Sequence, residues 1–84
     1  MNPRIHQVAA SDDHTLTITF TNDEVRIFDM RPYLGYAVFE PLRNVAFFKL
    51  ARADHGTVAW PHEIDFDPDT LYLESHPVPT RQAA

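Results

Sequence analysis

Strict alternation of apolar and polar residues over residues 14–21 restricts the fold more than any other feature of the sequence. Threonines occupy every second position, and a period of two is typical of a strand with one face in a core and the other toward water. A second alternating run, residues 24–29, follows the turn formers Asn22 and Asp23. Two such runs joined by a short Asn/Asp turn predict an antiparallel hairpin over residues 16–28.

Three further segments have the pattern of strands. Residues 5–10 form a short candidate strand that ends at the turn formers of residues 11–13. Residues 46–53 and residues 57–60 are predicted to pair as a second hairpin, because a turn sequence containing Gly56 separates them. The sequence thus predicts an N-terminal strand and two hairpins.

Prolines and turn residues allow only short helices. Pro32, Gly35 and Pro41 interrupt residues 30–44, so we expect there a connection with a short helix that covers the sheet. Asp67 and Pro68 have the pattern of a helix start, with the aspartate as N-cap and the proline at the first helical position. Residues 75–84 contain two prolines and little apolar mass, and are expected to be a flexible C-terminal tail.

Together these elements predict a single α+β domain over residues 1–74, followed by the tail. The domain is expected to contain a small antiparallel β-sheet of two hairpins plus a short N-terminal strand, with one or two short helices. The apolar positions of these elements define the expected core. The core residues are Leu16, Ile18, Phe20, Ile27, Phe39, Leu42, Phe48, Leu50, Val58, Trp60 and Leu71.

Chain length and composition limit the classes of protein to consider. A chain of 84 residues fits one domain, but so small a domain has little core with which to enclose a deep catalytic cavity. The absence of cysteine excludes disulfides, thiolate metal ligands and a cysteine nucleophile. No apolar run approaches the ~20 residues that span a bilayer, and the N-terminus lacks the apolar segment of a signal peptide. We therefore expect a complete, soluble, cytoplasmic protein that does not contact membranes.

The charge distribution favours a protein partner over nucleic acid. The formal net charge is -5, the acidic residues concentrate between positions 54 and 74, and the seven basic residues are scattered. Nucleic-acid binding requires clustered cations, so we expect none directly. Arg26, Lys49 and Arg52 are expected to share the threonine face of the sheet, as a solvated surface or as a dock for an acidic segment. The acidic balance itself suits a basic partner protein.

Histidines and carboxylates gather in residues 55–69, where a metal site has to be considered. The three aspartates at alternate positions resemble the opening of an EF-hand loop. That loop requires glycine at its sixth position and glutamate at its twelfth, where this chain has Thr70 and His76. Capping and solvated carboxylates explain the pattern more simply. We predict no bound metal ion and no cofactor.

Catalytic chemistry is not expected in this segment either. Asp67 is already assigned as a helix cap, and nothing in a short polar loop indicates the burial that would raise the pKa of a carboxyl group. The chain contains only two glycines, and it has neither a Gly-rich phosphate loop nor a Ser-His-Asp arrangement. We predict that the protein is not an enzyme and has no catalytic residues.

A recognition surface is the third interpretation of the same segment. Trp60, His62, Glu63 and Asp65 could present an aromatic anchor within a polar rim, as interface hot spots do. The favoured alternative for Trp60 is a place in the core, because a small domain needs its largest side chain inside. A small-ligand or metal-binding protein, or a weak hydrolase, would use His62, Glu63 and Asp65, provided that they converge on a concave pocket.

The order of these features resembles the bacterial family of domains of unknown function numbered 2442. The most specific match is a series near the C-terminal end, and the resemblance covers roughly residues 8–72. The matching segments are Leu16-Thr17-Ile18-Thr19-Phe20, Val25-Arg26-Ile27-Phe28-Asp29, Phe39-Glu40-Pro41-Leu42, Phe47-Phe48, Gly56-Thr57-Val58-Ala59-Trp60-Pro61 and Ile64-Asp65-Phe66-Asp67-Pro68-Asp69-Thr70-Leu71-Tyr72. The sequence departs from the family after Asn22, where Asp-Gly is usual, and after Pro61, where Asn-Gly is usual.

The resemblance implies a small α+β fold without an established activity. Members resemble the small partners of toxin–antitoxin-like pairs in size and gene setting, which is an analogy and not an argument from a site. We therefore expect a non-enzymatic interaction or regulatory module that binds a partner protein, as the acidic member of such a pair. The interaction requires an exposed apolar patch or an open sheet edge, either of which could also join two copies as a homodimer.

Overall fold

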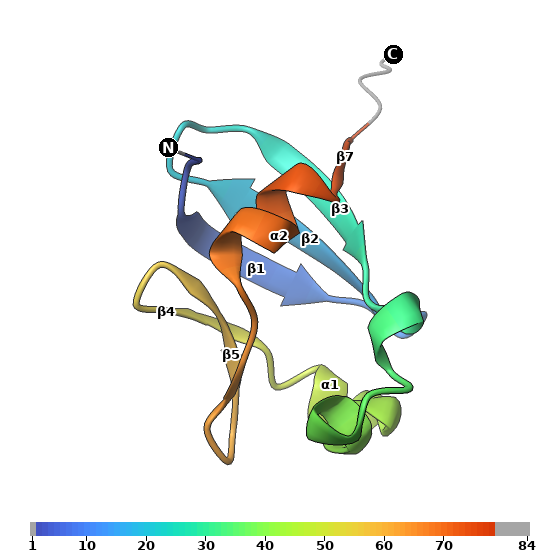
Figure 1. Ribbon diagram of the computed structural model, residues 1–84. Helices are drawn as coiled ribbons and strands as arrows, with labels where there is room; N and C mark the ends of the chain where they lie inside the picture. Colours follow the sequence, from blue (N-terminus) through green and yellow to red (C-terminus); the bar gives the residue numbers. More distant parts are fainter. Residues whose placement is uncertain (1, 79–84) are drawn as a thin grey trace.

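A four-stranded antiparallel sheet forms one side of the molecule in the computed structural model, which describes residues 2–78. Its strands, in the spatial order β1-β2-β3-β7, are β1 (Ile5–Ala10), β2 (Thr15–Phe20), β3 (Val25–Asp29) and β7 (His76–Pro77) (Figure 1). The alternation of β2 has the expected result, since its three apolar side chains are buried and its three threonines half-buried. The predicted N-terminal strand and first hairpin are confirmed.

A second, smaller sheet lies beside β1. It contains β4 (Arg52–Asp54), β5 (Thr57–Trp60) and β6 (Ile64–Asp65). The backbone N–H of Ile5 donates to the carbonyl oxygen of Gly56 at 3.0 Å and ties the two sheets together. The α+β class is therefore correct, but the strands are divided between two sheets instead of one.

The predicted strand over residues 46–53 is wrong for most of its length. Residues Val45–Phe48 form helix α1, whose N-cap Asn44 accepts a hydrogen bond from the N–H of Phe47 at 3.1 Å. A short apolar run is compatible with the periodicity of a strand and with that of a helix. Here the capping asparagine favours the helix. The strand begins only at Arg52, so Leu50, expected in the core, is 53% exposed.

Short helices connect the two sheets and cover the larger one. The 3-10 helices η1 (Arg31–Tyr33) and η2 (Ala37–Arg43) follow β3, and α2 (Pro68–Leu73) lies across the larger sheet (Figure 1). As predicted, Asp67 caps α2, and its Oδ2 accepts from the N–H and hydroxyl of Thr70 at 2.9 and 2.8 Å. None of the helices that the structure describes is long and apolar enough to cross a membrane.

The core lies between the larger sheet and the elements that cover it. Nine of the eleven residues expected there are buried, and the exceptions are Ile27 and Leu50. Ile27 pairs with Thr17 and therefore points outward with it, while Phe28 pairs with Leu16 and is buried. The two adjacent apolar residues of β3 fit either phase of the alternation, and only the register with β2 decides between them.

The first residues of the predicted C-terminal tail belong to the fold. Ser75 is only 4% exposed, and the two residues of β7 pair with Arg26 and Ile27 of β3. The domain boundary expected at residue 74 is therefore too early. Residues 79–84 of the predicted tail lie outside the described residues.

Left-handed backbone conformations recur at the hairpin turns. His14 (φ 63°) and Asp23 (φ 72°) each end a turn of the larger sheet. In the smaller sheet, His62 (φ 68°) and Glu63 (φ 61°) are the last two residues of the three-residue turn between β5 and β6. Such turns favour Gly and Asn, so the departure of this sequence from the family pattern after Pro61 lies where side chains are least tolerated.

Candidate functional site

Trp60, one of the four residues predicted for a recognition surface, belongs to the core. Its side chain is fully buried, its Nε1–H donates to the carbonyl oxygen of Phe48 at 2.8 Å, and its ring stacks on that of Phe48 at 6.0 Å. The favoured interpretation of Trp60 is correct. A recognition surface in this region therefore has to use the polar residues that follow Trp60.

His62 and Glu63 form the exposed tip of the β5–β6 hairpin. Both side chains are exposed, although the imidazole of His62 lies parallel to the ring of Phe47, with 5.8 Å between the ring centroids. Two consecutive left-handed residues with side chains are costly, at roughly 1–2 kcal/mol each relative to an unstrained backbone. The turn therefore holds two ionisable side chains at a position where Asn-Gly would be more stable.

The three polar residues of the predicted site line one hollow of about 470 Å³ on the outward side of the smaller sheet. His62, Glu63 and Asp65 share it with Arg52 and Asp54. The guanidinium of Arg52 lies 3.7 Å from the carboxylate of Asp54. The hollow thus has one basic residue among three carboxylates.

No group of three or more His, Asp or Glu side chains in the described part of the chain is arranged to hold a metal ion. The alternate aspartates of residues 65–69 run along β6 and the start of α2 instead of wrapping around a point. Asp67 is used as the N-cap, and Asp69 lies 3.4 Å from the amide of Asn2.

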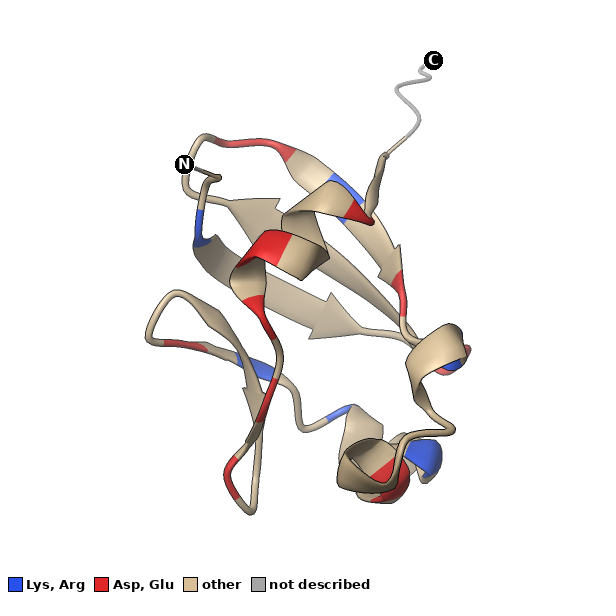
Figure 2. Cartoon of the chain, viewed as in Figure 1, with Lys and Arg blue, Asp and Glu red and all other residues tan. Residues whose placement is uncertain are grey.

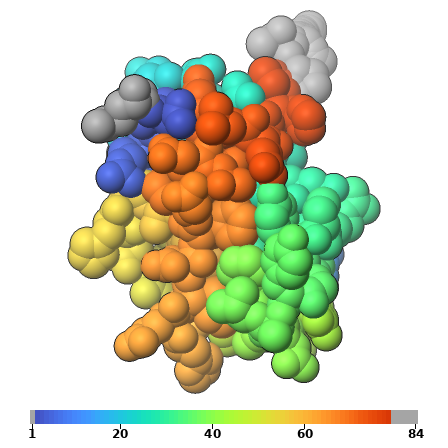
Figure 3. All heavy atoms as spheres, in the orientation of Figure 1, coloured from blue at the N-terminus to red at the C-terminus, as the bar shows by residue number. Residues whose placement is uncertain are grey.

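Exposed acidic residues follow one another along the chain from the tip of the β5–β6 hairpin to the end of α2, with residues 70–73 between the last two. In Figure 2 the acidic positions follow one another along this segment, and Figure 3 shows the same segment at the surface. Apolar Ile64 and Phe66 alternate with the first carboxylates and are buried. Residues 63–74 contain no Lys or Arg. The acidic stripe consists of Glu63, Asp65, Asp67, Asp69 and Glu74, all exposed.

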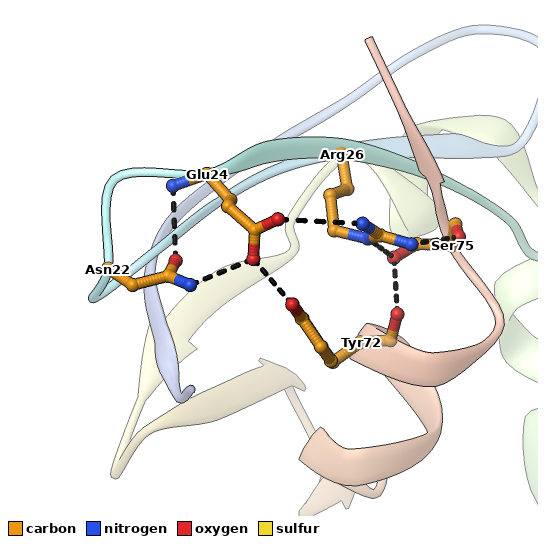
Figure 4. A network of polar contacts seen from close by, with 5 residues as sticks. All are labelled: Asn22, Glu24, Arg26, Tyr72 and Ser75. Carbon is orange, nitrogen blue, oxygen red and sulfur yellow. Dashed lines mark hydrogen bonds and ion pairs between the residues drawn. The ribbon is translucent and has the colours of Figure 1, made fainter. Parts of the chain in front are cut away.

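A polar network at the other end of α2 fastens the C-terminal segment to the sheet (Figure 4). Arg26 donates from Nε to the hydroxyl of Ser75 and from a terminal nitrogen to its carbonyl oxygen, both at 2.7 Å. The guanidinium carbon also lies 4.8 Å from the centre of the Tyr72 ring. Arg26 therefore binds α2 and β7 to the inner face of the sheet and is not on the threonine face, where we expected it.

Glu24 completes this network at the surface. Its carboxylate accepts hydrogen bonds from the hydroxyl of Tyr72 at 2.6 Å and from the amide of Asn22 at 2.8 Å. The hydrogen bond from Tyr72 lowers the pKa of Glu24 and raises the pKa of Tyr72. The sequence pattern does not reveal this network, because its hydrogen-bonded partners are up to 49 residues apart. The network could have been predicted if Glu24, Arg26 and Phe28 had been taken as the inward residues of β3.

The ionisation of Tyr33 gives a pH-dependent test of the C-terminal end of α2. Its hydroxyl donates to Glu74, and this bond raises the pKa of Tyr33 from 10.0 to about 12. A raised pKa means that the stabilisation is complete below pH 10 and is lost as the pH rises toward 12. We expect tyrosinate absorbance to show a late step near this value that the Tyr33→Phe variant lacks. Global unfolding before that step, seen by circular dichroism, would contradict the assignment.

Replacing Glu63 with glycine is expected to stabilise the protein by about 1 kcal/mol, because glycine adopts a positive φ without steric cost. The measurement is the free energy of unfolding from urea denaturation. Glu40→Gly is the matched control, since it removes the same charge from η2 and should destabilise by roughly 0.5–1 kcal/mol. Equal destabilisation by both changes would show that the turn is not strained.

A comparison with known protein families confirms the resemblance. Residues 5–77 match the family described as Protein of unknown function (DUF2442), which is most of the chain. No curated protein and no solved structure matches this chain. The matched range includes both sheets, α2 and β7, so it extends beyond the segments on which the resemblance was based. The chain belongs to the DUF2442 family of proteins of unknown function.

Proposed function

We propose that this protein is a non-enzymatic interaction module that binds a basic segment of a partner protein in the cytoplasm through its acidic stripe. The observation that carries the proposal is the run of five exposed carboxylates over residues 63–74, uninterrupted by any Lys or Arg. A surface that carries charges of one sign attracts a segment of the opposite charge and repels segments of the same charge. The predicted partner surface around His62, Glu63 and Asp65 forms one end of this stripe.

The strained hairpin tip supports the same proposal. Folding stability alone would favour Asn-Gly at residues 62 and 63, whereas the chain has an imidazole and a carboxylate there, both exposed. Strained left-handed residues with side chains are concentrated at binding and catalytic sites. We infer that the tip contacts the partner. The imidazole of His62 packs against the parallel ring of Phe47.

The pairing with a toxin-like partner stays a prediction from the family resemblance. In the present proposal the partner is defined only by its chemistry, as a protein with a segment rich in Lys or Arg. Such contacts weaken with salt because they depend on the attraction of solvent-exposed charges.

Affinity purification of the tagged protein from its own host, at native expression and followed by mass spectrometry, tests the proposal. We expect a stoichiometric partner that is recovered at low salt and lost at high salt. With the Glu63→Gln/Asp65→Asn double variant, most of the partner should no longer be recovered. The matched control, Asp12→Asn/Glu40→Gln, makes the same change in charge elsewhere and should retain it. Equal recovery with both double variants would exclude the stripe as the binding surface.

The hollow of the smaller sheet favours a second candidate, the binding of a small polar ligand. Its volume of about 470 Å³ falls in the range of about 300–1,000 Å³ that is usual for ligand sites. Arg52 places a positive charge in the hollow, and the neighbouring carboxylates place negative charges in it. If the protein is recovered without a partner, two-dimensional NMR with a panel of charged metabolites should show shifts confined to these residues.

A further inference from the structure

We propose that a hollow beside the N-terminal strand binds a small carboxylate through the guanidinium of Arg4. The hollow has a volume of about 440 Å³ and lies between the residues that precede β1 and the turn after β2. We call it the N-terminal hollow, and it is lined by Asn2, Pro3, Arg4, Thr21 and Asn22. This end of the larger sheet is far from the tip of the β5–β6 hairpin (Figure 1). The proposal therefore goes beyond the acidic stripe and does not depend on it.

Arg4 is the only Lys or Arg among residues 2–78 whose charged group has no polar partner in the described part of the protein. Arg43 donates to the carbonyl oxygen of Leu34 at 2.6 Å. The remaining basic side chains lie between 2.8 and 3.7 Å from a carboxylate oxygen, and they are Arg26, Arg31, Lys49 and Arg52. In a chain with 12 acidic residues, the guanidinium of Arg4 is thus left available for an external anion.

The backbone and the stem of Arg4 are nevertheless held in place. Its N–H donates to Oγ1 of Thr21 at 3.2 Å, and its carbonyl oxygen accepts from the N–H of Thr21 at 2.8 Å. The stem packs over Gly56, where a Cβ atom would lie 3.4 Å from Cβ of Arg4 and 3.6 Å from its Cγ and Cδ. A side chain that is already positioned loses less conformational freedom when it binds a ligand.

The other polar groups of the N-terminal hollow offer donors, because their acceptors are already engaged. Oγ1 of Thr21 accepts from Arg4, and Oδ1 of Asn22 accepts from the N–H of Glu24 at 3.1 Å. The hydroxyl hydrogen of Thr21 has no acceptor among the described residues. No carboxylate is among the lining residues. A ligand that is negatively charged and only accepts hydrogen bonds matches these groups.

The charges around the N-terminal hollow favour a carboxylate over a phosphate. An arginine can bind either group with two parallel hydrogen bonds. However, Asp69 lies 3.4 Å from the amide of Asn2, and Glu24 lies 2.8 Å from the amide of Asn22. These carboxylates and the net charge of -5 repel a dianion more strongly than a monoanion. Pro3 and the aliphatic stem of Arg4 provide apolar surface for the hydrocarbon part of a small carboxylic acid.

Two-dimensional NMR of the full chain, titrated with propionate at constant ionic strength, tests the site. We expect amide shifts confined to the N-terminal hollow, with a dissociation constant of about 1 mM. Arg4→Gln should raise this constant about tenfold or more, because charge-assisted hydrogen bonds are lost. Arg43→Gln is the matched control. It removes the same charge from an exposed side chain of η2 and should bind propionate like the wild type.

Methyl phosphate serves as the competing anion at about pH 7.5, where a phosphate monoester is mostly a dianion because its second pKa is about 6. It should bind more weakly than propionate. Circular dichroism establishes that each variant is folded. If Arg4→Gln is unfolded, Arg4→Lys replaces it. That variant keeps the charge and the stem but not the planar donors, and it should also bind propionate more weakly than the wild type.

Three results would overturn the proposal. They are the absence of shifts with propionate, equal or tighter binding of methyl phosphate, and unchanged binding of propionate by a folded Arg4 variant. None of these results affects the acidic stripe, because Arg4 is not part of it. Loss of the basic partner would equally leave the N-terminal hollow unaffected.

Discussion

Replacing Trp60 with alanine is expected to destabilise the protein by about 3–5 kcal/mol, which is the usual cost of deleting a buried aromatic side chain. The indole is fully buried against Phe48, and its N–H satisfies the carbonyl oxygen of that residue. Domains of this kind have a total stability of about 5–15 kcal/mol. The variant should therefore lose a large part of the stability of the domain and unfold at a much lower urea concentration than the wild type.

Urea denaturation followed by far-ultraviolet circular dichroism measures this effect, because the chain has one tryptophan and the variant loses its fluorescence. Trp60→Phe is an intermediate variant. It keeps an aromatic ring in the core but loses the hydrogen bond to Phe48 and part of the packed volume, so it should be less destabilised than the alanine variant. An alanine variant with near wild-type stability would mean that Trp60 is not in the core.

Replacing Arg26 with methionine is expected to cost about 2–3 kcal/mol, because hydrogen bonds from a charged donor are lost and buried acceptors are left unpaired. The guanidinium donates twice to Ser75, which is only 4% exposed, and lies over the ring of Tyr72. Methionine keeps the apolar stem but cannot donate. The same denaturation experiment gives the free energy of unfolding.

Arg31→Met is the matched control for this change. Arg31 also makes two hydrogen bonds to a single partner, Asp29, but its side chain is 65% exposed and that of Arg26 only 16%. Exposed ion pairs contribute roughly 0–1 kcal/mol, so the control should lose little stability. Equal losses in both variants would show that the contact between Arg26 and Ser75 contributes no more than a surface pair.

The turns illustrate how far local sequence could specify this fold. Asn22 and Asp23 predict a hairpin turn correctly, and Asp67 with Pro68 predicts both the start and the cap of α2. These features depend on interactions between residues a few positions apart, which the sequence contains directly. The left-handed conformations of His62 and Glu63 could not be predicted from their residue types, because those types avoid them.

The candidate site was predicted in part. The sequence pattern predicts His62, Glu63 and Asp65 as a set, and the three residues line one hollow. Arg52 also lines this hollow, although it was expected on the threonine face of the larger sheet, because the sequence does not show that the second hairpin forms a sheet of its own. Tertiary pairing decides which distant side chains share a surface.

The sequence by itself determined the α+β class, the strands β1, β2, β3 and β5, and most of the core, because alternation and capping are local properties of the chain. Tertiary structure decided the phase of β3, the helix at residues 45–48 and the attachment of β7. Each of these segments fits two patterns almost equally well. The choice depends on which side chains can be buried against partners far away in the chain, such as Leu16 against Phe28 and Ser75 against Arg26.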